Sequence, residues 1–360
     1  RKNLFATTPG IIIVGAVIGL IAVWLQKLGN PANMGICVAC FERDVAGGLG
    51  LHRAAIVQYL RPEIMGLVLG SLAAAIATRE FKPRGGSAPI VRFVLGMIAA
   101  MGALVFLGCP WRAILRLAGG DGNAILGLAG LATGIWFGTL FFKKGYSLGR
   151  SNSQSVVSGA LFPVIAVCLL LLYLIFPQIP ISRKAAPLFY SVKGPGSQHA
   201  PFIASLGLAF IIGIFAQRSR FCTMGAFRDL FLFRYTHLFL GLAAMFAAAF
   251  IANALTGGLK FGFEGQPVAH SDFLWNYLGM VTAGLAFALA GGCPGRQLFM
   301  AGEGDSDAGI FALGMLVGAA MAHNLGTASS GTGIGVYGMQ ATILGFAVCL
   351  IIGFVHSKKA

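Results

Sequence analysis

Two short motifs in this 360-residue sequence join a cysteine to a nearby arginine, and each motif occurs twice. The first reads Gly-Cys-Pro-x-Arg, with cysteines at Cys109 and Cys293 and arginines at Arg112 and Arg296. Proline is favoured at the first position of a helix, where its missing N–H costs nothing. Each cysteine is therefore predicted to cap a helix, beside free N–H groups and a positive dipole end. Such a place suits an anion.

The second motif reads Cys, five residues, Arg-Asp, and its copies are Cys37 with Arg43-Asp44 and Cys222 with Arg228-Asp229. An unpaired charge inside a membrane is costly, so these charges need partners. We expect Arg43 to approach Asp229, and Arg228 to approach Asp44, across a symmetry axis between the two copies. The four charged residues would then form a structural clamp, while Cys37 and Cys222 lie in unwound chain where they can meet a solute.

Cys37 and Cys40 also form a Cys-x-x-Cys pair, which is typical of redox-active dithiols in a suitable fold. Its repeat partner has Gly225 where Cys40 stands, and a zinc site would need two more ligands. The six histidines show no ligand spacing. We therefore expect neither a metal nor a cofactor. Cys168 and Cys349 stand inside apolar runs and are interpreted as packing residues.

The composition identifies the class of protein that must position these motifs. Hydrophobic residues make up 57% of the chain and charged residues 10%, whereas soluble proteins carry about 25% charged residues. The net charge of +15 lies in short loops between apolar runs, which indicates membrane orientation rather than nucleic-acid binding. Neither a phosphate-binding loop nor a hydrolase motif is present, so the sequence does not predict an enzyme.

A helix needs about 20 apolar residues to cross a membrane. Ten runs meet this requirement approximately, and they are 11–28, 62–78, 92–108, 124–142, 156–176, 201–217, 237–256, 273–291, 308–327 and 340–356. No small-residue cleavage site follows the first run, so it is interpreted as a true span. Four segments that hold the cysteine motifs are too short or too polar to span, and they are 35–60, 109–120, 218–236 and 292–306. Interrupted segments of this kind point to a transport site.

The motifs recur at an offset of 184 or 185 residues, and a third block, at Asp121 and Asp305, keeps the same offset. This indicates a duplication, with repeats at 1–150 and 201–360 joined by a linker helix and loop at 151–200. Loops 79–92 and 143–150 are basic and fall on the side of the amino terminus and the tail, whereas loops 257–272 and 328–339 fall on the other. The basic side should be cytoplasmic. The sequence thus predicts an all-α integral membrane protein with nine to ten spanning helices, half-spanning helices and two inverted repeats.

The sequence resembles the YeeE/YedE family of sulfur-compound membrane transporters. The runs that carry the resemblance are Gly-Ile-Cys37-Val-Ala-Cys40-Phe-Glu-Arg-Asp, Gly-Cys109-Pro-Trp-Arg, Arg-Phe-Cys222-Thr-Met-Gly and Gly-Gly-Cys293-Pro-Gly-Arg. It is closest to the YedE branch, which is proposed to carry selenium. The resemblance implies an hourglass fold in a bacterial inner membrane, with a central path lined by cysteines at Cys37, Cys109 and Cys293. The extra Cys40 and the retained Cys222 depart from the family pattern.

These observations favour a transporter for a small, soft sulfur or selenium anion such as thiosulfate. Neutral thiols are weak hydrogen-bond donors that match a polarizable terminal sulfur better than they match sulfate. The expected path residues are Cys37, Cys40, Cys109, Cys222, Cys293, Arg112 and Arg296. Two alternatives remain open. One is a membrane thiol-disulfide oxidoreductase that uses Cys37 and Cys40. The other is a docking subunit for a cytoplasmic, TusA-like sulfur or selenium carrier protein, bound through loops 79–92 and 143–150.

Overall fold

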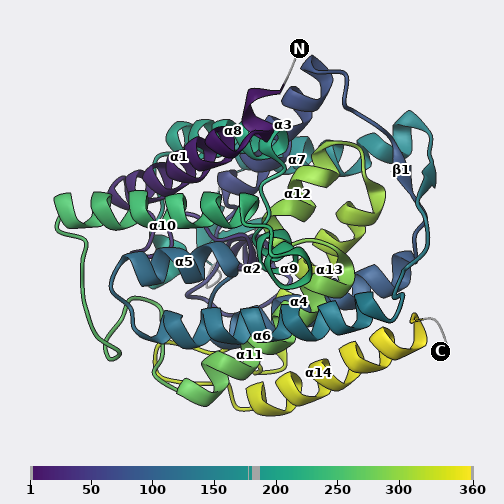
Figure 1. The fold of residues 1–360 in the computed structure, drawn as a ribbon. Coiled ribbons are helices and arrows are strands. Elements are labelled where there is room, and N and C mark those ends of the chain that lie inside the picture. Colours follow the sequence, from purple (N-terminus) through teal and green to yellow (C-terminus); the bar gives the residue numbers. More distant parts are fainter. Residues whose placement is uncertain (1–2, 177, 181–186, 358–360) are drawn as a thin grey trace.

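The computed structural model describes residues 3–176, 178–180 and 187–357, and it is predominantly helical (Figure 1). The long helices are α1 (Thr8–Lys27), α3 (Pro62–Ala77), α4 (Pro89–Phe106), α6 (Asn123–Lys143), α7 (Val156–Ile175), α8 (Phe202–Ser219), α10 (His237–Leu255), α11 (Phe273–Ala290), α13 (Ser306–Asn324) and α14 (Gly338–Val355). Nine helical stretches of the described residues are long and apolar enough to cross a membrane, and α3 is a shorter apolar helix. The chain is therefore an all-α multi-pass membrane protein, as the sequence predicts.

Four short helices lie where the sequence is too short or too polar to span. They are α2 (Val38–Gly48), α5 (Pro110–Ala118), α9 (Thr223–Phe233) and α12 (Pro294–Gly302), and each begins directly after a cysteine. A helix of 9 to 11 residues rises about 14 to 16 Å, which is half of a hydrocarbon core of about 30 Å. Every residue of α2 is buried, so this helix lies inside the bundle rather than on its surface.

The remaining elements are small and lie in the connections. They are the 3₁₀ helices η1 (Leu4–Ala6) and η2 (Pro195–Ser197) and the strands β1 (Arg84–Gly85), β2 (Asn152–Ser153), β3 (Gln178–Pro180) and β4 (Leu188–Tyr190). The antiparallel pairing of β1 with β2 joins two basic connections. The parallel pairing of β3 with β4 lies within the stretch between α7 and α8.

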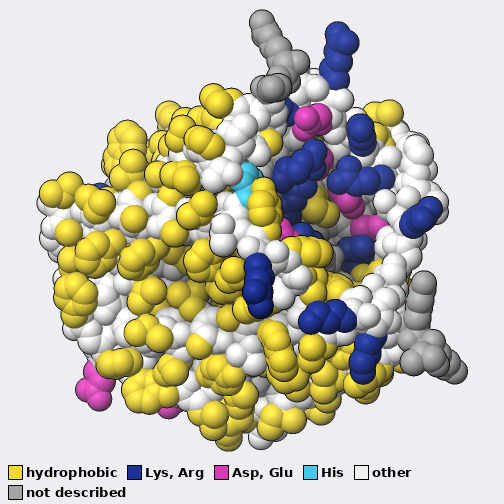
Figure 2. All heavy atoms as spheres, in the orientation of Figure 1, with side chains coloured by type: hydrophobic (Ala, Val, Ile, Leu, Met, Phe, Trp, Pro, Cys, Tyr) yellow, Lys and Arg dark blue, Asp and Glu magenta, His cyan; other side chains and the backbone are white. Residues whose placement is uncertain are grey.

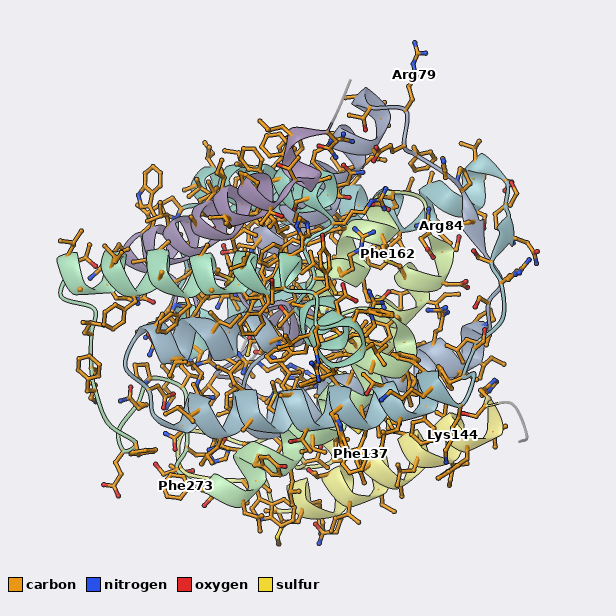
Figure 3. The ribbon with its side chains drawn as sticks, viewed as in Figure 1. Arg79, Arg84, Phe137, Lys144, Phe162 and Phe273 are labelled. Atoms are coloured by element: carbon orange, nitrogen blue, oxygen red, sulfur yellow. The ribbon has the colours of Figure 1, made fainter. Side chains whose placement is uncertain are left out.

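Contacts between loops agree with the two sides expected from charge. The pairing of β1 with β2 joins loop 79–92 to the segment after α6, and the Ser147 N–H donates to the His356 carbonyl in the tail at 3.1 Å. On the other side, the Ile334 N–H donates to Asp272 Oδ2 at 2.8 Å. Figure 2 shows most of its Lys and Arg side chains gathered at one side, and Figure 3 places Arg79, Arg84 and Lys144 there, away from Phe273.

The main contacts between the two halves of the chain come in pairs, and each pair is related by exchanging the corresponding helices of the halves. Helix α1 packs along α10 while α8 packs along α3, and α4 packs along α13 while α11 packs along α6. Figure 1 shows α1 beside α10 and α6 beside α11. Close approach depends on small residues: a Cβ on Gly102 of α4 would lie 2.6 Å from the Gly279 carbonyl of α11. These reciprocal contacts are what a twofold relation between the halves requires.

Candidate functional site

The first Cys-Pro turn, which we call the outer turn (Leu107–Arg112), brings two helix N-termini onto one pair of thiols. Cys109 is the N-cap of α5, and its backbone N–H donates to Cys37 Sγ at 3.4 Å. Cys37 is itself the N-cap of α2, and its Sγ accepts from the Cys40 N–H at 3.4 Å. The predicted cap at Cys109 is confirmed, and Cys37 lies in non-helical chain, as expected, where it also caps a helix.

The second Cys-Pro turn, the inner turn (Gly291–Arg296), repeats this arrangement. Cys293 is the N-cap of α12, and it adjoins the Cys222 thiol. Cys222 caps α9, with its Sγ accepting from the Gly225 N–H at 3.2 Å. The four capping cysteines are between 0% and 6% exposed. The fold therefore places two buried thiol pairs at converging helix N-termini, where a positive dipole favours a negative ligand.

Arg112 is a fully buried cation at the outer turn, and its partners are neutral. Its guanidinium donates to the carbonyls of Asn33 at 3.2 Å, Val268 at 3.0 Å and Leu107, and it contacts Cys40 Sγ at 3.7 Å. It forms no ion pair with any carboxylate in the described part of the chain. A buried charge without a counter-ion is unfavourable, so an anion bound here would relieve that cost.

Arg296, the corresponding residue of the inner turn, has a different environment. Its Nη1 lies 3.2 Å from Glu303 Oε1, and Glu303 also approaches Arg84 at 3.5 Å. The position of Glu303 in the first repeat is occupied by Gly119, which offers no carboxylate. The inner turn is therefore neutralised by the protein, and the outer turn is not.

The expected ion pairs across the symmetry axis do not form among the described residues. Arg43 instead pairs with its neighbour Asp44 at 2.7 Å, and Arg228 pairs with Asp229 at 2.8 Å. Asp44 also accepts from Arg61 at 2.8 Å, and Arg61 holds the carbonyls of Pro195 and Gln198 between α7 and α8. The long arginine side chains fold back onto the adjacent carboxylates, so the clamp joining the two repeats is a wrong prediction.

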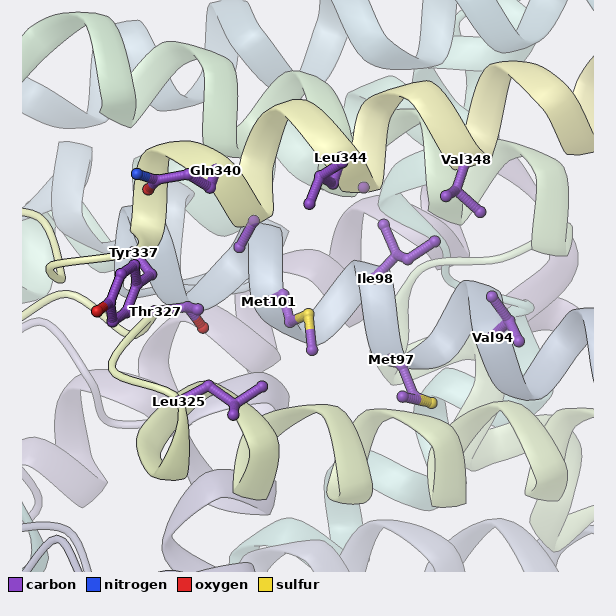
Figure 4. Close-up of a pocket in the computed structure, with 12 residues that line it drawn as sticks. Val94, Met97, Ile98, Met101, Leu325, Thr327, Tyr337, Gln340, Leu344 and Val348 are labelled. Carbon is purple, nitrogen blue, oxygen red and sulfur yellow. The ribbon is translucent and has the colours of Figure 1, made fainter.

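A cavity of about 370 Å³ lies over the outer turn, on the side of loops 257–272 and 328–339, and its mainly apolar lining also includes polar and charged side chains. Its lining includes Arg43, Leu107, Val268, His323 and Ser329. His323 Nε2 and Ser329 Oγ are buried without a hydrogen-bond partner in the described residues. A larger cavity of about 510 Å³ lies between α4 and α14 and contains no charged side chain (Figure 4). Only the first of these two suits an anion.

Sequence reasoning missed three side chains around the turns. Trp111 is the variable residue of the Gly-Cys-Pro-x-Arg motif, so its presence in one copy against Gly295 in the other was a visible signal. Glu303 lies seven residues after Arg296, about two helical turns away, which is a weak signal. Glu42 is buried on α2 with Oε2 unpartnered in the described residues, and no motif marks it.

The fold and these turns define a class: a multi-pass helical membrane protein with cysteines and a buried arginine gathered inside the bundle. Residues 218–354, which hold the inner turn, match a family model described as sulphur transport. The thiosulfate transporter TsuA of Spirochaeta thermophila is 32% identical over 106 residues, which are 29% of this chain and 32% of that relative. The chain thus aligns with about a third of the length of this relative. The family resemblance predicted from the motifs is confirmed, and the selenium branch stays a prediction.

Proposed function

We propose that this protein transports a small anion with a terminal sulfur, of the thiosulfate type, across a bacterial inner membrane. The observation that carries the proposal is the outer turn, where a thiol pair at two helix N-termini lies beside a buried arginine that binds only neutral groups. The sulphur-transport match to residues 218–354 and the name of the relative support the same class of substrate.

The proposed path begins in the cavity over the outer turn and passes from Cys37, Cys40 and Cys109 to Cys222 and Cys293. Arg112 attracts the charge, and the thiols donate weak hydrogen bonds to the terminal sulfur. Several weak sites in series allow the anion to enter and leave without being trapped. Sulfate, which lacks a soft terminal atom and is strongly hydrated, would gain little from these thiols.

The proposed topology places two inverted repeats, 1–150 and 201–360, around this path, with α7 and the loop after it between them. The odd number of crossings contributed by α7 reverses the second repeat relative to the first. Loops 79–92 and 143–150 then face the cytoplasm, as their positive charge requires. A TusA-like carrier protein that accepts sulfur from the substrate would dock on these basic loops.

Uptake of labelled thiosulfate into proteoliposomes tests the proposal, with sulfate and selenite as competing anions. We expect concentration-dependent uptake that excess thiosulfate suppresses and excess sulfate does not. Competition by selenite would support the selenium branch. Cys168→Ala is the matched control, because Cys168 is an exposed cysteine on α7. Absence of thiosulfate uptake by correctly inserted protein would reject the proposed substrate.

One contact favours the oxidoreductase alternative: Cys37 and Cys40 are neighbours, and the Cys40 N–H donates to Cys37 Sγ at 3.4 Å. A dithiol of this kind could be oxidised to a disulfide while another membrane component is reduced. Both cysteines are fully buried, so a soluble partner could not reach them directly. Trapping of free thiols during turnover separates the two functions, since a transporter keeps both cysteines reduced and an oxidoreductase cycles them.

A further inference from the structure

Trp111 reaches from the outer turn to the inner turn. It is the second residue of α5, two positions after Cys109, and its side chain is 1% exposed. Its ring packs edge-on against Phe221, which directly precedes Cys222, with 5.7 Å between ring centroids. A Cβ placed on Gly295, the corresponding residue of the inner motif, would lie 3.2 Å from Trp111 Cζ2. One side chain therefore touches residues next to both thiol pairs.

The two copies of the motif supply unequal side chains at this place. The first copy contributes the largest side chain available, and the second contributes Gly295, which has none. Phe299 of α12 lies 5.9 Å from the Trp111 ring and closes another side of the same space. A second bulky residue at position 295 would overlap the indole, so the space between the turns is built for a single ring.

The indole N–H of Trp111 is buried and has no hydrogen-bond partner among the described residues. Indole is a donor only, and nearly all buried donors in folded proteins are paired. The rings of Phe221 and Phe299 offer it no lone pair. An acceptor that passes between the two turns, such as an oxyanion, would satisfy this donor.

We propose that Trp111 is the barrier between the two thiol pairs and also a hydrogen-bond donor to the anion that crosses it. The inference rests on the proposed transport function. The substrate class is a small anion that carries both oxygens and a terminal sulfur, since the oxygens accept from the indole while the sulfur meets the thiols. The missing side chain at Gly295 leaves room for the ring to tilt as the anion passes.

The donor role is tested by thiosulfate uptake into proteoliposomes that contain Trp111→Phe, which keeps an aromatic ring but removes the N–H. We expect about a tenfold lower rate, as for the loss of one hydrogen bond to a charged group. Trp136→Phe is the matched control, because Trp136 lies on α6 with 45% of its surface exposed. A wild-type rate in Trp111→Phe would overturn the donor role.

The barrier role is tested without any substrate. A small negatively charged methanethiosulfonate is added to the outside of intact cells, and peptide mass spectrometry measures labelling of Cys293. We expect Cys293 to be protected in the wild type and in Gly295→Ala, and labelled in Trp111→Ala. Gly295→Ala should also slow uptake, because its Cβ contacts the ring. Equal protection of Cys293 in the wild type and in Trp111→Ala would overturn the barrier.

The outcomes of these two measurements can be distinguished from the failure of the proposed transport function. If the wild type carries no thiosulfate, the proposed substrate is wrong, and the labelling of Cys293 still decides whether Trp111 separates the two sides. A merely structural role of Trp111 would lower the amount of inserted protein. It would not open a route from the outer surface to an inner cysteine, so membrane abundance is measured beside the labelling.

Discussion

The outer and inner turns share one backbone plan and differ in what surrounds their arginines. Both place a cysteine at the N-cap, a proline at the first helical position and an arginine in the first turn. Arg112 binds carbonyl groups, whereas Arg296 pairs with Glu303. The outer turn therefore keeps an uncompensated positive charge that can capture an anion. The inner turn is already neutral and would hold the same anion less firmly.

The two turns also differ in the residue that caps the long helix before each of them. The C-cap residue of α4 is Leu107, with φ of 63°, and that of α11 is Gly291, with φ of 87°. Glycine adopts this left-handed conformation freely, whereas another residue pays about 1 to 2 kcal/mol for it. The Leu107 carbonyl accepts from Arg112 Nη1, which helps to hold the strained turn. The outer turn thus carries a backbone cost that the inner turn, with glycine at this position, does not.

The largest expected effects come from the capping cysteines themselves. Cys109→Ala and Cys293→Ala should abolish thiosulfate uptake at normal membrane abundance, while Cys168→Ala and Cys349→Ala leave it nearly intact. Cys293→Ser keeps a donor and should retain more uptake than Cys293→Ala, if passage uses reversible hydrogen bonds. Uptake assays on the five variants measure this. Equal behaviour of all the cysteine variants, or a persulfide that accumulates on Cys293 during turnover, would contradict it.

The next largest effect concerns the cation of the outer turn. Arg112→Gln should lower uptake at least tenfold, because a hydrogen bond to a charged group contributes about 1.5 to 3 kcal/mol. Arg112→Lys keeps the charge but not the planar guanidinium that donates to four carbonyls, so it should rescue only partly. Binding of thiosulfate to purified protein, followed by isothermal calorimetry, separates lost affinity from lost folding. An unchanged affinity for thiosulfate in Arg112→Gln would contradict the idea that the uncompensated charge of the outer turn captures the anion.

The contrast between the turns also shows what the sequence could predict. Proline after each cysteine is a local constraint, so both N-caps and the short helices were predictable from a few residues. Ion pairing was not predictable, because Asp44 accepts from Arg61, 17 residues away, and Arg43 folds back onto its neighbour Asp44. The environment of Arg112 depends on Val268, which only the tertiary fold brings near, whereas Glu303 follows Arg296 at the end of the same short helix. Helix positions follow from apolar length, but charge compensation follows from packing.

A smaller effect is expected at the inner turn, where the protein supplies the counter-ion. Glu303→Gln removes the charge that neutralises Arg296, so the inner turn should come to resemble the outer one. We expect thiosulfate to bind several-fold more tightly and to leave more slowly, with a lower maximal uptake rate. Glu264→Gln, in the exposed loop 257–272, is a charge-matched control. A higher maximal rate in Glu303→Gln would show that release is not limited at this turn.

The smallest effect should come from Cys40, the third thiol of the outer turn. Its Sγ lies 3.7 Å from Arg112 Nη1, and the inner turn has Gly225 in its place, so this thiol is an addition to the shared plan. For a transporter, Cys40→Ala removes one weak contact and should reduce thiosulfate affinity only about twofold. For a dithiol oxidoreductase, Cys40→Ala would be as damaging as Cys37→Ala, because a disulfide needs both sulfurs. Uptake and thiol trapping on these two variants therefore discriminate between the two functions. A twofold change in Cys40→Ala beside a large loss in Cys37→Ala supports transport. Equal, complete losses in both variants would favour redox chemistry.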